Sequence, residues 1–342
     1  MATGRDLSIG DWGEFSFIDF LARRLPPLEA GLELGIGDDA SCWCPAAGDR
    51  VLTTLDMLVE GVHFDLSYTS AADLGWKALA VNLSDIAAMG GRPRCAYLGL
   101  GLPPQTSKAW LKEFIDAFLG LAADSGVQLA GGDTVKSRQL VISVTLNGVS
   151  CGLPQLRSGA VVGDDIYCSG TIGDSFLGLQ LLAGKLEPAS PSGTAFLHQR
   201  HLRPSPRLEL GRELAKAGAV SALIDISDGL AADLGHLLAA SGGLGAELEA
   251  EWLPFSEPAR RFLAAGQTTV AELLTGGEDF ELLFTAPPEK ASLITGIASA
   301  LELPVSRIGR IVSPAGLRLR GAEGTTELGI KGGYDHFQSQ DQ

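Results

Sequence analysis

The sequence predicts an α/β (α+β) fold made of two mixed α/β domains. Its 342 residues are too many for one simple core, and chains of this length commonly divide into two domains. The composition, with 45% hydrophobic residues, 44 glycines and few aromatic residues, suits short buried segments joined by many tight turns. Apolar runs of strand length alternate with amphipathic helical patterns in both halves of the chain, which indicates mixed α/β architecture in each.

Charge and cysteine usage exclude several classes of partner. The net charge of −15 disfavours nucleic acid and anionic membranes but admits small phosphorylated ligands, because bound divalent cations can reverse the local sign. No run of 18 apolar residues could span a membrane, and the N-terminus lacks the pattern of a secretion signal. The five cysteines include no C-x-x-C pair, so we expect reduced thiols, no zinc site and a cytoplasmic location.

The first domain is expected over residues 1–150. Helical patterns cover residues 12–24 and 108–125, and a third helix runs from Ala72 to the stop at Gly90-Gly91. Strands are predicted at 32–37, 51–55, 127–129 and 140–149, with a further apolar segment at 96–102 that Pro103-Pro104 ends.

The second domain is expected over residues 151–342, after a loop at 151–162 that carries Arg157-Ser-Gly. Strands are predicted at 165–169 and 246–249. One helix is predicted at 175–182, and another is predicted to end at Ser241. The run from Gly276 to about Ile311 reads as strand, helix and strand.

Asp85 is the most unusual residue of the first domain. It lies in a largely apolar helix, and the residues three and four positions away include no lysine or arginine. A buried, unpaired carboxylate is costly, so Asp85 is either solvated, paired with a distant arginine, or directed at a cation.

Other acidic residues share a position at glycine-rich turns or strand ends. Each alone has a structural explanation, because aspartate side chains bond to the backbone in turns. As a set they predict a site for several hard cations such as Mg²⁺, which take oxygen ligands from one or two carboxylates each. The set comprises Asp38 and Asp39, Asp56, Asp133, Asp225 and Asp228, and Glu278 and Asp279.

Three familiar motifs are excluded. Gly35-Ile-Gly-Asp-Asp-Ala40 matches a loose dinucleotide pattern, but its carboxylates would repel pyrophosphate and no helix start follows. Asp225-Ile-Ser-Asp-Gly resembles a calcium loop, yet His236 stands where a bidentate glutamate is needed. The chain has no G-x-x-x-x-G-K-[S/T], so a kinase here is not of the P-loop type.

A series of motifs, in order along the chain, resembles the thiamine-monophosphate kinases, which belong to the superfamily of aminoimidazole ribonucleotide synthetase and selenophosphate synthetase. The resemblance extends from about Gly13 to Phe337. Its most specific parts are the motif that contains His63, the GGEDFELLFT motif and the GGYDHF motif. The motifs are GIGDDA (35–40), D-x-L-V-x-G-x-H-F (56–64), AVNLSDIAAMGG (80–91), GGDT (131–134), HLRPSPR (201–207), IDISDGL (224–230), GGEDFELLFT (276–285) and GGYDHF (332–337).

The resemblance implies transfer of the γ-phosphate of ATP onto thiamine monophosphate, giving thiamine diphosphate, with several Mg²⁺ ions. It also implies that the first domain, of the aminoimidazole ribonucleotide synthetase type, forms a homodimer and that the second completes the active site. The implied metal set is Asp38, Asp39, Thr54, Leu55, Asp56, Asp85, Asp133, Asp225 and Asp228, with Asp85, Asp228 and Arg157 as catalytic residues. ATP would be bound by Gly132, Asp133, Arg157 and Ser227, and the acceptor by His63, Glu278 and Tyr334.

One residue departs from the family pattern and others keep a structural alternative. Leu55 stands where relatives often have a hydroxyl residue, so a metal contact there must come from its backbone carbonyl. His63 and Tyr334 also fit packing roles, and Arg157 fits a solvated surface charge. A phosphate acceptor is already ionised and needs no strong general base, so the requirement is mainly for cations and an arginine. A different acceptor within the superfamily, or a non-catalytic nucleotide-binding scaffold, are the alternative functions.

Overall fold

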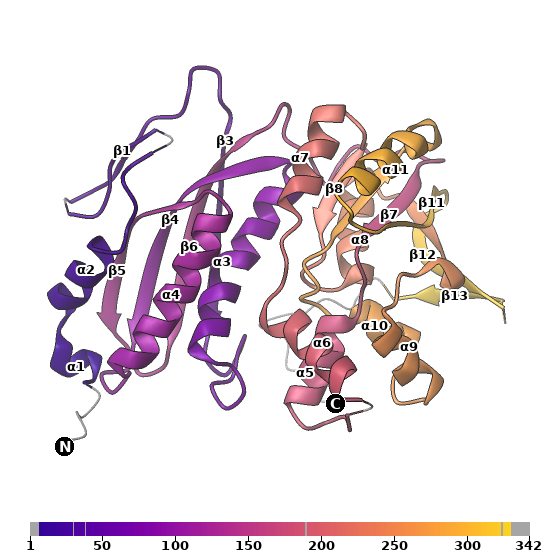
Figure 1. Ribbon diagram of the computed structural model, residues 1–342. Helices are drawn as coiled ribbons and strands as arrows, with labels where there is room; N and C mark the ends of the chain where they lie inside the picture. Colours follow the sequence, from indigo (N-terminus) through magenta and orange to yellow (C-terminus); the bar gives the residue numbers. More distant parts are fainter. Residues whose placement is uncertain (1–6, 30, 38, 189, 323, 330–342) are drawn as a thin grey trace. The chain divides into compact units, whose positions relative to one another are not determined.

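The computed structural model describes residues 7–29, 31–37, 39–188, 190–322 and 324–329. The chain divides into two compact units, the first made of residues 1–86 and 91–150 and the second of residues 87–90 and 151–342 (Figure 1). Both contain helices packed on sheets, so the mixed α/β architecture predicted for each half is confirmed. Among the helices of the described residues, none is long and apolar enough to cross a bilayer.

The first unit is built on a four-stranded sheet with the order β3-β6-β4-β5, in which only β4 and β5 are parallel. A separate two-stranded sheet joins β1 and β2. The elements are α1 (Ile9–Trp12), α2 (Glu14–Ala22), β1 (Leu32–Leu34), β2 (Cys42–Trp43), β3 (Val51–Val59), α3 (Ala71–Ala88), β4 (Gly91–Leu102), α4 (Lys108–Asp124), β5 (Gln128–Lys136) and β6 (Val141–Ser150).

Helices α3 and α4 pack closely on one another and lie along the sheet (Figure 1). Ser107 caps α4 by accepting a hydrogen bond from the Trp110 backbone N–H, and Phe114 and Phe118 are fully buried. A Cβ atom at Gly75 of α3 would lie 2.1 Å from the Phe114 carbonyl oxygen, so only glycine permits this approach of the helices. The sequence predicted both helices because the apolar residues of each recur at helical spacing and form one continuous apolar face.

Strand β3 has one buried and one exposed side. Leu52 and Leu58 are 8% and 6% exposed, whereas Leu55 and Met57 are 57% and 49% exposed. Since side chains alternate along a strand, Thr54 and Asp56 share the side of Leu52 and Leu58. The other side of this edge strand presents apolar side chains to the surface.

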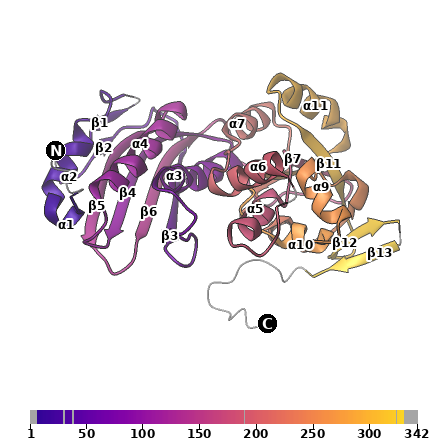
Figure 2. The same cartoon turned by 60° about the horizontal axis from the view of Figure 1, so that its bottom comes forward.

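The second unit has a seven-stranded sheet with the order β13-β12-β9-β11-β7-β10-β8, with β12 and β13 at one edge (Figure 2). Its strands are β7 (Asp165–Ser169), β8 (Ala222–Asp225), β9 (Gly245–Glu249), β10 (Leu282–Ala286), β11 (Val305–Val312), β12 (Gly316–Gly321) and β13 (Gly324–Leu328). Its helices are α5 (Asp174–Leu182), α6 (Pro191–Leu202), α7 (Leu208–Ala217), α8 (Leu230–Ala240), α9 (Glu257–Ala264), α10 (Val270–Thr275) and α11 (Ala291–Ala300), with short 3₁₀ turns at Ala250–Trp252 and Pro288–Lys290.

Two hydrophobic clusters cover the two faces of this sheet. Leu283 of β10 belongs to the cluster that includes residues of α5, α8, α9 and α10, whereas Leu282 and Phe284 belong to the cluster with α7 and α11. The alternation along one strand between two apolar cores explains why the β10 sequence is apolar at consecutive positions.

Several predicted elements differ from the structure. The strands predicted at 51–55 and 127–129 extend to Val59 and Lys136, so Asp56 and Asp133, which were expected at strand ends, lie within β3 and β5. The helix predicted at 12–24 is divided at Gly13, whose φ of 83° interrupts it between α1 and α2. The strand predicted at 32–37 ends at Leu34. The strand predicted from Gly276 begins only at Leu282, because Glu278 and Phe280 have φ values of 67° and 50°, which an extended strand does not allow.

Candidate active site

In the first unit, Thr54, Asp56 and Asp85 come together where β3 meets α3. The Thr54 hydroxyl donates a hydrogen bond to Oδ2 of Asp85. Asp56 is two residues from Thr54 on the same side of β3, which places its carboxylate beside that of Asp85. The Leu55 side chain points to the opposite, exposed side of the strand, so only its backbone is available to this group.

The electrostatics of this group favour a cation. Burial, together with the charge of Asp85, raises the pKa of Asp56 from its ordinary value to about 6. Two carboxylates that repel one another and a hydroxyl oxygen are hard oxygen donors of the kind that Mg²⁺ prefers. Thr54, Asp56 and Asp85 therefore fit a divalent metal ion.

Gly132 and Asp133 lie at the other edge of the same sheet. They are on β5, three strand spacings or roughly 14 Å from β3. Asp133 pairs with Gly99 of β4 and is exposed, and a Cβ atom at Gly132 would lie 2.0 Å from the Leu98 carbonyl oxygen. The packing of β5 on β4 thus requires glycine at position 132, independently of its predicted role in ATP binding.

The strands that flank Asp39 lie near this second edge as well. The strands β1 and β2, which flank its loop, pack through Leu32 against Cys95 and Ala130 of the sheet, and Ser41 Oγ lies 2.6 Å from Tyr97 Oη. The structure therefore divides the predicted metal ligands of the first unit between two edges of one sheet. Asp38 lies outside the described residues.

His63 lies in the turn after β3. Its Nδ1 accepts a hydrogen bond from the Val59 backbone N–H at 3.1 Å, and its ring is partly buried. The neutral imidazole therefore carries its proton on Nε2, which leaves that nitrogen as a donor. Both the packing role and the acceptor-binding role agree with this geometry.

In the second unit, Asp225 ends β8 and Ser227 and Asp228 follow it. A residue that the motif argument did not select, Asp233 of α8, accepts hydrogen bonds from the backbone N–H groups of Ser227 and Asp228, both at 3.0 Å. Burial and the charges of Asp225 and Asp228 raise the pKa of Asp233 to about 8. Like Asp85, Asp233 is a carboxylate in an apolar helix, and that pattern could have identified it.

Asp233 also adds a possible metal ligand. One carboxylate oxygen each from Asp228 and Asp233 and a ring nitrogen of His236 lie within 4.8 Å of one another. Asp233 is buried, whereas His236 is exposed. Asp228 and Asp233 therefore fit a second cation-binding group, while His236 is the residue that excluded a calcium loop in the sequence.

Glu278 lies directly beside this segment. Its backbone N–H donates to the Ser227 carbonyl oxygen at 2.8 Å, and its carboxylate Oε2 is 3.3 Å from Nδ1 of the buried His201. The structure thus brings together Ser227, Asp228 and Glu278, which are distant in sequence. Arg157 is exposed, in agreement with a solvated charge as well as with a binding role, and Tyr334 lies outside the described residues.

Comparison with known proteins identifies the family. Models of the N-terminal and C-terminal domains of AIR synthase related proteins match residues 37–150 and 161–321. The thiamine-monophosphate kinase of Escherichia coli (strain K12) is 40% identical over 328 residues, which cover 95% of this chain and 98% of the relative. The chain belongs to the thiamine-monophosphate kinase family.

Solved structures of thiamine-monophosphate kinases share the fold. The crystal structure of the enzyme from Stenotrophomonas maltophilia K279a matches with a TM-score of 0.79 and 40% identity, covering 89% of this chain and 95% of that one. The structure of AaThiL complexed with AMPPCP and TMP matches with a TM-score of 0.72 and 34% identity, covering 96% and 99%. The motif resemblance found in the sequence is confirmed.

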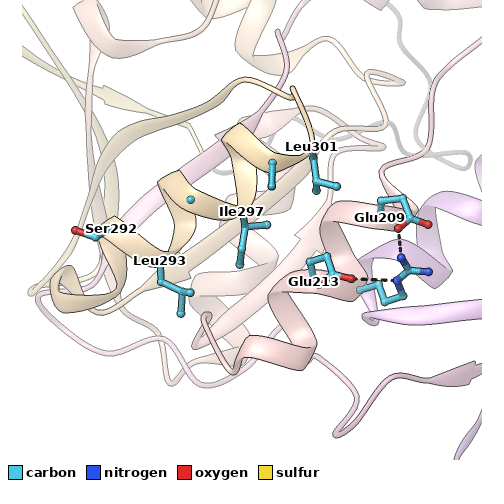
Figure 3. Close-up of a pocket in the computed structure, with 9 residues that line it drawn as sticks. Glu209, Glu213, Ser292, Leu293, Ile297 and Leu301 are labelled. Carbon is cyan, nitrogen blue, oxygen red and sulfur yellow. Dashed lines mark hydrogen bonds and ion pairs between the residues drawn. The ribbon is translucent and has the colours of Figure 1, made fainter.

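A pocket of about 450 Å³ in this kinase-family chain contains none of the predicted site residues. It lies between α7 and α11 and is lined by Leu293 and Ile297 and by Arg212, which is paired with Glu209 and Glu213 (Figure 3). Two carboxylates around a single arginine do not attract a polyphosphate. None of the candidate metal-binding carboxylates described above lines this pocket, so we do not include it in the candidate active site.

Proposed function

We propose that this protein transfers the γ-phosphoryl group of ATP to thiamine monophosphate and forms thiamine diphosphate. The observation that carries the proposal is the match, at 34% identity over 96% of the chain, to AaThiL complexed with AMPPCP, an ATP analogue, and TMP. The 40% identity to a thiamine-monophosphate kinase over nearly the full length of both chains supports the same acceptor.

Mg²⁺ is the metal that the proposed function requires. We assign Thr54, Asp56 and Asp85 to one metal-binding group and Asp225, Asp228 and Asp233 to another, because each offers hard oxygen donors close together. Bound Mg²⁺ would neutralise phosphate charge during an in-line transfer. Asp39 and Asp133 remain predicted ligands at the other edge of the first sheet.

The protein side chains have separate tasks in this proposal. Asp85 and Asp228 hold the metal ions, and Arg157 binds the nucleotide phosphates, with Gly132 and Ser227 beside the nucleotide. His63 and Glu278 bind the acceptor, and Tyr334 is predicted to bind it with them. No residue acts as a strong base, because the attacking phosphate oxygen is already ionised.

We also propose that the protein is a homodimer. Val51, Leu55 and Met57 of β3 are 47%, 57% and 49% exposed and point to one side of the sheet of the first unit. Apolar side chains gathered on an open sheet face are stabilised when a second copy covers them. The cytoplasmic location stays a prediction.

The test is a product assay. The purified protein is incubated with ATP, Mg²⁺ and thiamine monophosphate, and the products are separated, with other phosphorylated acceptors in parallel. We expect ADP and thiamine diphosphate in equal amounts. ADP without thiamine diphosphate, or turnover of another acceptor only, would contradict the proposal, and nucleotide binding without turnover would favour the scaffold alternative.

A further inference from the structure

The HLRPSPR motif has no task in the proposed function, yet the structure connects it to the acceptor-binding segment. Arg200 near the end of α6 and Arg207 at the start of α7 both reach Glu281, which is fully buried. The Arg200 guanidinium lies 2.9 Å from Oε1 of Glu281, and Arg207 Nε donates to Oε2 at 2.7 Å. Ser169 Oγ donates to the same carboxylate at 2.6 Å. We call Ser169, Arg200, Arg207 and Glu281 the Glu281 network.

This network anchors one end of a segment with unusual backbone geometry. Glu278 and Phe280, just before Glu281, have backbone φ values of 67° and 50°, which residues other than glycine rarely adopt. Residues in such a conformation persist only where their surroundings determine it. An extended or helical backbone at Glu278 would send its side chain in another direction.

Further hydrogen bonds fix the rest of the segment. The N–H groups of Glu278 and Phe280 donate to the carbonyl oxygens of Ser227 and Ile226, both at 2.8 Å. The Asp279 carboxylate accepts from the backbone N–H groups of Gly173 and Ser175 at 2.6 and 3.1 Å. The segment is therefore held from both sides, and Glu281 provides the charged attachment.

Helix α6 also brings a histidine ring nitrogen close to the Glu278 carboxylate. His201, the neighbour of Arg200, is buried, and its Nδ1 lies 3.3 Å from Oε2 of Glu278 and 3.1 Å from Oγ of Ser175. The Glu278 side chain is 29% exposed, so one part of it is held by the protein and the rest faces outward.

We propose that Arg200, Arg207 and His201 are positioning residues for the acceptor. Through Glu281, the two arginines keep Glu278 and Phe280 in the left-handed conformation, and His201 orients the Glu278 carboxylate toward the thiamine end of the acceptor. The inference rests on the proposed function, because it assumes that Glu278 binds thiamine monophosphate. It assigns His201 and Arg207 of the HLRPSPR motif, together with Arg200 just before the motif, to acceptor recognition and not to ATP or metal binding.

The experiment compares Arg207→Lys with a matched control, Arg307→Lys. Lysine keeps the charge but cannot bind both oxygens of a carboxylate. Arg307 also pairs with a buried carboxylate on a different part of the sheet, but through a single contact, 2.9 Å from Nη2 to Oδ1 of Asp165. We expect Arg207→Lys to raise the KM for thiamine monophosphate by about tenfold or more, with the KM for ATP within about twofold of wild type. Arg307→Lys should change neither KM.

A second readout reports the segment directly. Hydrogen exchange at the Phe280 amide, which donates to Ile226, should accelerate in Arg207→Lys and not in Arg307→Lys. His201→Asn, which retains a hydrogen-bonding side chain, should raise the acceptor KM without accelerating this exchange. If Arg207→Lys does not fold, the acceptor KM of His201→Asn provides the test of the inference.

The outcomes separate this inference from the proposed function. Absence of thiamine diphosphate with the wild-type protein contradicts the proposed function. An active wild type with folded Arg207→Lys or His201→Asn of unchanged acceptor KM overturns the inference alone. Equal increases in the KM of ATP and acceptor, or the same acceptor defect in Arg307→Lys, also overturn it, because they indicate a general structural effect.

Discussion

Thr54, Asp56 and Asp85 lie on a regular strand and helix, whereas Asp228 and Glu278 lie in segments without regular secondary structure. In the first unit the β3 alternation and the packing of α3 determine where the carboxylates point. In the second, residues 226–228 and 276–281 take their shape from hydrogen bonds to Asp233, Ser227 and the Glu281 network. Site residues on regular elements therefore depend on local packing, and those in loops depend on buried polar groups far away in the sequence.

The largest effect should come from breaking the buried network in the second unit. Glu281→Ala leaves two guanidinium groups without their buried partner, and we expect a loss of about 3–5 kcal/mol in the free energy of unfolding. Glu257→Ala, which removes an exposed pair with Arg261, is the control and should change stability by less than about 1 kcal/mol. Urea unfolding of both variants measures the difference. Similar midpoints for the two would mean that the network does not hold the segment.

In the first unit, removing a charge should affect turnover and not folding. Asp85→Asn keeps the shape of the side chain, and we expect turnover to fall on the order of 10²-fold or more, equivalent to roughly 3 kcal/mol in the activation barrier. Stability should stay equal or rise, because the repulsion between Asp85 and Asp56 is removed. Asp116→Asn, on the exposed side of α4, is the control for activity. An active or unfolded Asp85→Asn protein would return Asp85 to a structural role.

A smaller effect should separate the two substrates. Glu278→Gln should weaken acceptor binding by roughly 1–3 kcal/mol, because a charged hydrogen bond is lost, and should leave ATP binding unchanged. Arg157→Ala should do the reverse, since Arg157 is assigned to the nucleotide phosphates. Apparent affinities for both substrates in both variants provide the measurement. The close approach of Glu278 to Ser227 gives the opposite result a clear meaning: a higher ATP requirement in Glu278→Gln would place Glu278 with the metal-binding residues.

The smallest effect concerns pH. The pKa of Asp56 is raised to about 6 in the folded protein, so without metal the folded state binds more protons than the unfolded state between about pH 4 and 6. Stability in EDTA should therefore fall as pH rises through this window and level off above it, by on the order of 1 kcal/mol because Asp56 is partly exposed. Asp56→Asn should remove this contribution, and Mg²⁺ should restore stability above pH 6. A wild-type curve that coincides with that of Asp56→Asn in EDTA would contradict the raised pKa.

The sequence predicts the features that depend on neighbouring residues. The apolar pattern of α3 and α4 and the unusual position of Asp85 both follow from local spacing. Asp233 could have been found by the argument used for Asp85, but it belongs to no ligand motif that we recognised.

Other features depend on contacts that local pattern does not encode. The pairing of Arg207 with Glu281 spans 74 residues of sequence, and the left-handed backbone at Glu278, which we propose this pairing maintains, is not indicated by the residue type. Likewise, the strand order that separates Asp133 from Asp56 is set by long-range pairing. The motifs predicted the candidate site residues, and only the fold shows which of these residues lie close together.

The contact of Gly75 with the Phe114 carbonyl gives α3 a mechanical property. Gly75 lies ten residues before Asp85, or about 15 Å along the same helix. A methyl group at position 75 would push the helix away from α4, and a stiff helix transmits that displacement along its length to the carboxylate. Gly75→Ala is therefore a candidate for a heat-sensitive allele, in which every site residue is intact but Asp85 is out of register with Thr54.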